Sequence, residues 1–218
     1  PGELVPVKVS GIVHTGAGEL IGIGHLTGNM YGMEYNIDGV SWLYEAALDI
    51  DHLEINIKHV ICGQGELANG VLESSDFDKA SNRFVMTFST ATSPTQIYTV
   101  GGEDRNEKVM HTRERVLGVD SALLSGGEDA SFISHDGTRN SARLYLPSEK
   151  LGFKGPRPVV YYIHGGPQSQ ERPDFAWFSM PLIQYLTLNG FAVFVPNVRG
   201  STGYGLTYTK QVERDWGG

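Results

Sequence analysis

The chain has 218 residues, of which 40% are hydrophobic and 19% charged, and its formal net charge is −8 at pH 7. This length can bury a core in one large or two smaller domains, and the acidic balance argues against nucleic acid or an anionic membrane as the main partner. No apolar run approaches the ~18 residues of a membrane span. The single Cys62 excludes an internal disulfide framework and favours a reducing compartment, so we expect a cytoplasmic protein.

Both ends of the sequence have the pattern of internal segments. It opens on PGELVPV, which lacks a Met and is already strand-like, and it closes on RDWGG. We therefore expect a piece of a longer protein, and the absence of a visible signal peptide carries no weight.

The first 121 residues consist of short apolar runs separated by turn residues, a pattern typical of antiparallel strands. Turn-forming stretches such as GAGE, NIDG, GQGE and GGEDRN separate the runs, and no amphipathic helix interrupts the series. Many short antiparallel strands predict a sandwich, a barrel or propeller blades. The strand-like runs cover residues 4–15, 20–26, 31–37, 41–49, 55–61, 82–88 and 95–100.

Two segments of this half resemble each other. SWLYEAALDI at residues 41–50 and TQIYTVGGED at residues 95–104 are each followed by polar residues and another strand-like stretch. Their interval is about that of one four-stranded blade, since propeller repeats are ~40–50 residues long. This self-similarity favours propeller blades.

From residue 122 the pattern changes. ASFISHDGTRNSARLYLP predicts a hairpin with residues 135–138 at its turn. PRPVVYYIHGGP predicts a short apolar strand that ends in a glycine pair, and FAVFVPNV predicts a second buried strand. The strand, helix, strand order predicts parallel pairing and the start of an α/β domain.

A helix is expected between those two strands, over residues 175–188, and Asn189-Gly190 is a typical helix end. Its predicted apolar face contains five side chains at helical spacing. They are Phe175, Phe178, Leu182, Tyr185 and Leu186.

The glycine pair Gly165-Gly166 has the pattern of an oxyanion-stabilising loop. In α/β-hydrolase sheets, a backbone N–H in the loop after a central strand stabilises the charge that develops on a carbonyl oxygen during acyl transfer. Glycine permits unusual backbone angles and leaves room for the substrate. Gly166 is the better candidate donor, and Pro167 then restricts the exit from the loop.

The combination of VVYYIHGGPQSQERP, a helix, GFAVFVPNVRGSTGYG and DWGG resembles the prolyl oligopeptidase family of serine peptidases, with acylaminoacyl-peptidase-like members the most similar. The resemblance covers roughly residues 131–218. It implies partial β-propeller blades, the C-terminal ones, at residues 1–121, and the N-terminal part of an α/β-hydrolase domain at residues 122–218. It also implies the oxyanion role of Gly166 and the cleavage of short peptides.

One departure from the family pattern concerns the nucleophile. The family's serine lies in a G-x-S-x-G elbow, and no serine of this sequence is flanked in that way. Ser41 and Ser201 come nearest, and each lacks one glycine; His164 belongs to the oxyanion loop rather than to a triad. We therefore expect the catalytic Ser, Asp and His in a C-terminal segment outside these residues, so that this chain alone is inactive.

Three charged residues are weaker candidates for substrate contact. Glu171 and Arg172 follow the oxyanion loop and could face a cavity between the domains. Arg199, in NVRGSTGYG, could orient a substrate group, although such an arginine more often makes a structural ion pair. The acidic and histidine residues of DIDHLEINIKH fit no zinc or calcium spacing, so no metal and no cofactor is expected.

The predicted function is the hydrolysis of short peptides or N-acylated amino acids and peptides through an acyl-enzyme. Its expected partners are a peptide substrate and the missing catalytic segment. A carboxylesterase that uses the same site is one alternative, because amide and ester hydrolysis share the tetrahedral oxyanion. A non-catalytic propeller or scaffold module is the other.

Overall fold

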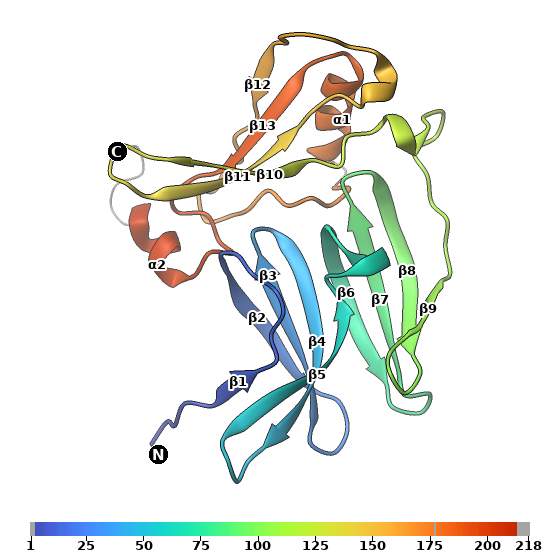
Figure 1. Cartoon of the computed structure of the whole chain (residues 1–218), viewed down its shortest axis with the longest axis vertical. Coiled ribbons are helices and arrows are strands. Elements are labelled where there is room, and N and C mark those ends of the chain that lie inside the picture. Colours follow the sequence, from blue (N-terminus) through green and yellow to red (C-terminus); the bar gives the residue numbers. More distant parts are fainter. Residues whose placement is uncertain (1–2, 177, 213–218) are drawn as a thin grey trace.

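A computed structural model describes residues 3–176 and 178–212 and contains three β-sheets. Two antiparallel sheets from the first half of the chain occupy the lower part of Figure 1, and a mixed sheet with a helix lies above them. The linking segment, after Met110, returns from the outer edge of the second sheet to the third.

The first sheet has five strands in the order β1-β5-β4-β3-β2. Neighbours pair antiparallel except β1, which runs parallel to β5. Of the long apolar run predicted at residues 4–15, only three residues form a strand. The strands are β1 (Lys8–Ser10), β2 (Gly18–His25), β3 (Met30–Ile37), β4 (Val40–Asp49) and β5 (Glu54–Cys62).

The second sheet is a four-stranded antiparallel meander in the order β6-β7-β8-β9, which follows the 3-10 helix Gly65–Leu67. Its first strand does not appear among the predicted runs, because the segment ESSD in its middle is polar and exposed. The strands are β6 (Gly70–Asp78), β7 (Arg83–Thr90), β8 (Ser93–Gly101) and β9 (Glu107–Met110).

The two antiparallel sheets pack against each other through an apolar core. Leu43 and Ile61 from the first sheet meet Leu72, Phe84 and Met86 from the second, and all five are buried. The two segments of similar sequence occupy equivalent places, because they form the third strand of each meander, β4 and β8. Their likeness therefore corresponds to a structural repeat of two sheets.

The third sheet has the order β10-β11-β13-β12. The predicted hairpin is confirmed by the antiparallel pairing of β10 with β11, and the predicted strand, helix, strand unit by the parallel pairing of β12 with β13. The elements are the 3-10 helix Ser121–Leu123, β10 (Glu128–Ile133), β11 (Arg139–Tyr145), the 3-10 helix Glu149–Leu151, β12 (Val159–Tyr161), α1 (Met180–Leu188), β13 (Ala192–Asn197), α2 (Leu206–Thr209) and the 3-10 helix Lys210–Val212.

The predicted apolar face of the helical segment is wrong in part, although Phe175 and Leu186 do pack against the core. The helix begins at Met180 rather than at residue 175, and it is Met180, Ile183 and Thr187 that are fully buried against the sheet. Leu182 and Tyr185, from the predicted face, are 46% and 64% exposed. The buried side of the helix also includes the polar Gln184, which an apolar pattern does not predict. Its side-chain amide bonds to Ala91, in the turn between β7 and β8, and to Ser125, before β10.

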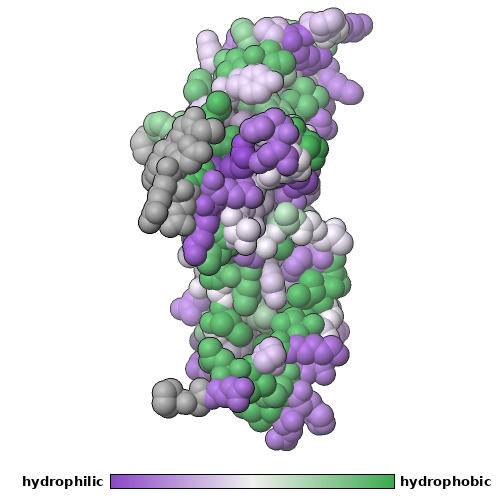
Figure 2. Space-filling model, turned by 90° about the vertical axis from the view of Figure 1, so that its left-hand side faces the viewer, coloured by the Kyte–Doolittle hydropathy of each residue, from purple (hydrophilic) through white to green (hydrophobic). Residues whose placement is uncertain are grey.

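Hydrophobic side chains are also exposed on the side of the molecule that carries β1 and β2. Figure 2 shows hydrophobic surface gathered over its lower part. Leu20, Ile21 and Ile23 of β2 are each at least 45% exposed, as is Val5 before β1. No helix of the described residues is long and apolar enough to cross a membrane.

Candidate active site

The glycine pair lies in the loop that follows the carboxyl end of β12. Gly166 has φ +137°, a backbone conformation that L side chains rarely adopt. A Cβ there would stand 2.9 Å from the backbone nitrogen of Gln168, whereas a Cβ on Gly165 would meet no atom within 4 Å. The conformation of the loop therefore requires a glycine at 166. At 165 a Cβ would point into open space, so the surroundings do not require a glycine there.

The N–H groups of this pair are available to a ligand. Gly165 and Gly166 are both exposed. Neither backbone nitrogen donates a hydrogen bond to any described residue. Free N–H groups at a loop are what stabilisation of an oxyanion needs, and the oxyanion role of Gly166 stays a prediction.

His164 is held beside the pair by Ser201. Its Nε2 lies 2.9 Å from the Ser201 hydroxyl, and its Nδ1 lies 2.9 Å from the carbonyl oxygen of Gly165. The Ser201 side chain is fully buried and its hydroxyl donates to the carbonyl oxygen of Val198. This serine and histidine therefore make a structural contact between the loops that follow β12 and β13.

Glu171 is engaged by its neighbours rather than presented to solvent. Its backbone N–H donates to Asn197 Oδ1 at 2.9 Å, and its backbone carbonyl accepts from Asn197 Nδ2 at 3.0 Å. The Ser179 hydroxyl donates to the Glu171 carboxylate. Burial raises the pKa of this carboxyl, and the Ser179 hydrogen bond lowers it less. The Glu171 side chain therefore bonds to the segment before α1 through Ser179.

Arg172 crosses to the first sheet. Its Nε donates to the carbonyl oxygen of Gly39 at 2.8 Å, and its Nη2 donates to the hydroxyl of Ser41 at 3.0 Å. Burial lowers the pKa of the guanidinium. Ser41, the other serine whose flanks approach an elbow, is fully buried between these groups. Arg172 thus joins the two halves of the chain.

Arg199 makes a structural ion pair, which is the role that arginines in such a position more often have. Its Nη1 lies 2.6 Å from Asp136 Oδ2, in the turn between β10 and β11. The pKa of Asp136 is lowered, first because its carboxylate accepts the backbone N–H of Thr138. The ion pair fixes the loop after β13 to the hairpin turn.

Two further residues at this interface were missed by sequence reasoning. The Glu19 carboxylate of β2 accepts hydrogen bonds from the backbone N–H groups of Gly203 at 3.0 Å and Gly205 at 3.1 Å. Asn36 Nδ2 of β3 donates to Gln170 Oε1 at 2.6 Å. No local pattern signals such contacts, because the partners are far apart in the chain.

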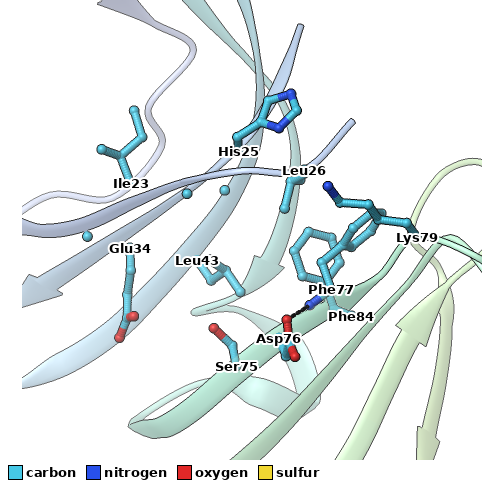
Figure 3. Close-up of a pocket in the computed structure, with 13 residues that line it drawn as sticks. Ile23, His25, Leu26, Glu34, Leu43, Ser75, Asp76, Phe77, Lys79 and Phe84 are labelled. Carbon is cyan, nitrogen blue, oxygen red and sulfur yellow. Dashed lines mark hydrogen bonds between the residues drawn. The ribbon is translucent and has the colours of Figure 1, made fainter. Parts of the chain in front are cut away.

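A pocket of about 330 Å³ lies between the first two sheets. In Figure 3 the side chains of Glu34 and Leu43 come from the first sheet, and those of Ser75 and Phe84 from the second. Burial raises the pKa of Glu34, and the charge of Arg172 lowers it less. All of the residues that line the pocket belong to the first two sheets or to the turns beside their strands.

No group of three or more metal-ligating side chains gathers within the described residues. In DIDHLEINIKH, His52 contacts Asp49 while His59 contacts Glu45, so the histidines have separate partners. The residues Asp215, Trp216 and Gly217, which the sequence analysis included in the family resemblance, lie outside the described residues.

Comparison with known proteins agrees with this geometry. Residues 176–218 match the sequence model of the prolyl oligopeptidase family. The chain is 36% identical over 103 residues to a probable dipeptidyl-peptidase 5 of Aspergillus terreus, covering 46% of this chain and 14% of the relative. It is 30% identical over 160 residues to that of Emericella nidulans, covering 70% of this chain and 21% of the relative.

Solved structures share the fold. A puromycin hydrolase superposes with a TM-score of 0.68 at 21% identity, covering 89% of this chain and 28% of its own. The acylaminoacyl peptidase of Pyrococcus horikoshii superposes with a TM-score of 0.64 at 22% identity, covering 91% of this chain and 28% of its own.

The described residues therefore share the fold of about a quarter of each of these two longer chains. The resemblance to the prolyl oligopeptidase family is confirmed. The chain spans only about a fifth or less of the length of these two curated relatives.

Proposed function

We propose that the complete protein is a serine peptidase that hydrolyses short peptides or N-acylated amino acids and peptides. The observation that carries the proposal is the exposed glycine pair at the carboxyl end of β12, with its two uncommitted N–H groups. The family match of residues 176–218 places this loop immediately before a segment shared with known peptidases.

In the proposed mechanism a serine outside these 218 residues attacks the scissile carbonyl carbon. The new C–O bond places negative charge on the carbonyl oxygen, which accepts the Gly166 N–H. Collapse of the intermediate breaks the C–N bond and releases the amine, which takes the serine's proton through a histidine base; water then hydrolyses the acyl-enzyme. This chain supplies the oxyanion donor and is inactive alone.

We further infer that the first two sheets are blades of a β-propeller. Each contains a four-stranded antiparallel meander, β2–β5 and β6–β9, and they pack face to face through one apolar core. The exposed apolar side chains of β2 and those on the outer face of the second sheet, Val85, Ile97 and Val109, would pack on further blades.

The catalytic segment is proposed to join the open edge of the third sheet. β12 is the last strand in the order β10-β11-β13-β12, so one of its edges has no partner among the described strands. Val159, Tyr161 and Ile163 at this edge are more than half exposed. An unpaired apolar edge strand is a liability in a finished fold, and another parallel strand would cover it.

The substrate class is testable on the complete protein with a matched pair of peptide amides. One has a free N-terminus, as a dipeptidyl-peptidase substrate would, and the other carries an N-acetyl group. Hydrolysis of either supports a peptidase. Turnover of a simple ester with neither amide hydrolysed would instead establish the carboxylesterase.

A further inference from the structure

The glycine loop makes few backbone hydrogen bonds, and its side-chain support within this half of the chain includes the contact of His164 with Ser201. Before it, the Tyr162 N–H donates to the carbonyl oxygen of Phe194 at 3.0 Å, and after it the Ser169 N–H donates to the carbonyl oxygen of Pro167 at 2.7 Å. Between these points, no backbone N–H donates to a described residue, and a Cβ on Gly165 would meet no atom within 4 Å. An oxyanion donor must nevertheless be fixed before the reaction begins.

The residues just after the loop are held from two sides. Within their own half of the chain, the Thr202 N–H donates to the carbonyl oxygen of Ser169 at 2.9 Å and Glu171 bonds to Asn197. Further hydrogen bonds come from the first sheet. Gln170 accepts from Asn36 Nδ2 at 2.6 Å, and Arg172 donates to Gly39 and to Ser41. All three partners lie in or beside the turn between β3 and β4. Residues 170–172 are therefore held on this turn by three hydrogen bonds.

The β3–β4 turn is itself well fixed. The Gly39 N–H donates to Asn36 Oδ1 at 3.0 Å, which closes the turn. The Ser41 hydroxyl also accepts the backbone N–H of Leu72 at 2.9 Å, which ties the turn to the second sheet. Because the β3–β4 turn is fixed in this way, residues bonded to it can fix the position of the more weakly held glycine loop.

We propose that Gln170 and Arg172 are positioning residues that hold the glycine loop against the β3–β4 turn. The Gly166 N–H is then correctly placed only while the two halves of the chain are docked. This inference rests on the proposed function, since it assigns the interface a part in forming the oxyanion site. Separation of the halves would disable the donor without touching the serine.

A purely structural role for these bonds predicts something different, and the same turn offers a matched control. The Ser141 hydroxyl of β11 donates to Asp38 Oδ1 at 2.8 Å, so it also joins the halves at the β3–β4 turn. It does so from a strand and not from the loop. Loss of this bond weakens the interface but leaves residues 170–172 in place.

The test uses the complete protein with Arg172→Ala, Asn36→Ala and the control Ser141→Ala. For each variant, kcat and KM are measured on a hydrolysed peptide amide, together with the inhibition constant of a peptide trifluoromethyl ketone. Such a ketone forms a tetrahedral adduct, so its affinity depends on the oxyanion donor. Urea unfolding of each variant verifies that it folds.

We expect Arg172→Ala and Asn36→Ala to lower kcat about tenfold or more, because small misplacements of reacting groups are costly. KM should change less than about twofold, and the inhibition constant of the ketone should rise in parallel with the loss of kcat. Arg172→Lys, which can reach one acceptor, should recover part of the loss. Ser141→Ala should keep the kcat of the parent.

Two outcomes would overturn the inference. One is an unchanged kcat in folded Asn36→Ala. This variant decides the question even if Arg172→Ala does not fold. The other is an equal loss of kcat in Ser141→Ala, which would show general weakening of the interface. If the parent protein hydrolyses no amide or ester and binds no ketone, it is the proposed function that fails instead.

Discussion

His164 and Ser201 form a serine–histidine contact that is not the start of a catalytic triad. Nε2 and Oγ are 2.9 Å apart, but the hydroxyl is fully buried and donates to Val198. A nucleophile must be able to reach a substrate carbonyl, and this oxygen cannot. Its part is to join the loops that follow β12 and β13.

Ser201→Ala in the complete protein should therefore retain a reactive serine. We expect a stability loss of about 2 kcal/mol, because the hydroxyl's hydrogen bonds with His164 and Val198 are both lost at about 1 kcal/mol each, and continued labelling by a fluorophosphonate. The measurement is the mass of the labelled protein beside a urea unfolding curve. Loss of all labelling in a folded Ser201→Ala sample would make Ser201 the nucleophile and contradict this account.

The two glycines of the loop should respond differently to alanine. In Gly166→Ala the φ of +137° and the 2.9 Å approach to Gln168 force the loop to move. We expect kcat to fall about 100-fold, as when one oxyanion donor is lost. Gly165→Ala serves as the steric control, because its Cβ would meet no atom. Its midpoint of unfolding should match the parent; equal destabilisation of both variants would show that the loop conformation is misassigned.

A buried ion pair joins the first two sheets. Arg105 donates from Nη2 to Glu45 Oε1 at 2.6 Å and from Nε to Glu45 Oε2 at 2.8 Å, and both side chains are more than nine-tenths buried. Arg105→Met should cost about 3–5 kcal/mol, because it removes the buried cation that pairs with the carboxylate and leaves it with the His59 contact. The double variant Glu45→Leu with Arg105→Met should be more stable than Arg105→Met. Urea unfolding measures both, and a double variant less stable than the single one would contradict this assignment.

The same carboxylate predicts an acid dependence of stability. Burial raises the pKa of Glu45, but hydrogen bonds from Arg105 and His59 lower it further, so that it lies below its usual value of 4.5. Because the folded-state pKa is below the unfolded one, the stabilisation is present above pH 4.5 and is lost as the pH falls through the folded-state value. Unfolding midpoints between pH 7 and pH 3 should show a smaller acid-induced loss in Glu45→Gln than in the parent. Equal losses would exclude the group.

Local patterns predicted much of the fold but little of the interface. Alternating apolar residues in β3, β4 and β7 identify strands directly, because those strands are buried on at least one face. β6 was missed because its middle is polar and exposed, and the face of α1 was misassigned in part because its buried side includes the polar Gln184 and Thr187.

In the candidate site, too, residues in a local pattern could be predicted and long-range contacts could not. Gly165 and Gly166 could be predicted, because a strand followed by two glycines is a local signal. The contacts of Arg172 with Gly39 and Ser41 could not, because they join residues more than 130 positions apart. Only the packing of the two halves brings them together.

The central claim is that a serine outside these residues acts with this loop. It is tested most directly by treating the complete, folded protein with a fluorophosphonate and mapping the labelled peptide by mass spectrometry. The account predicts one labelled serine in a G-x-S-x-G elbow C-terminal to Gly218, and reduced labelling in Gly166→Ala. A folded protein with no labelled serine, or with the label on Ser41 or Ser201, would contradict it.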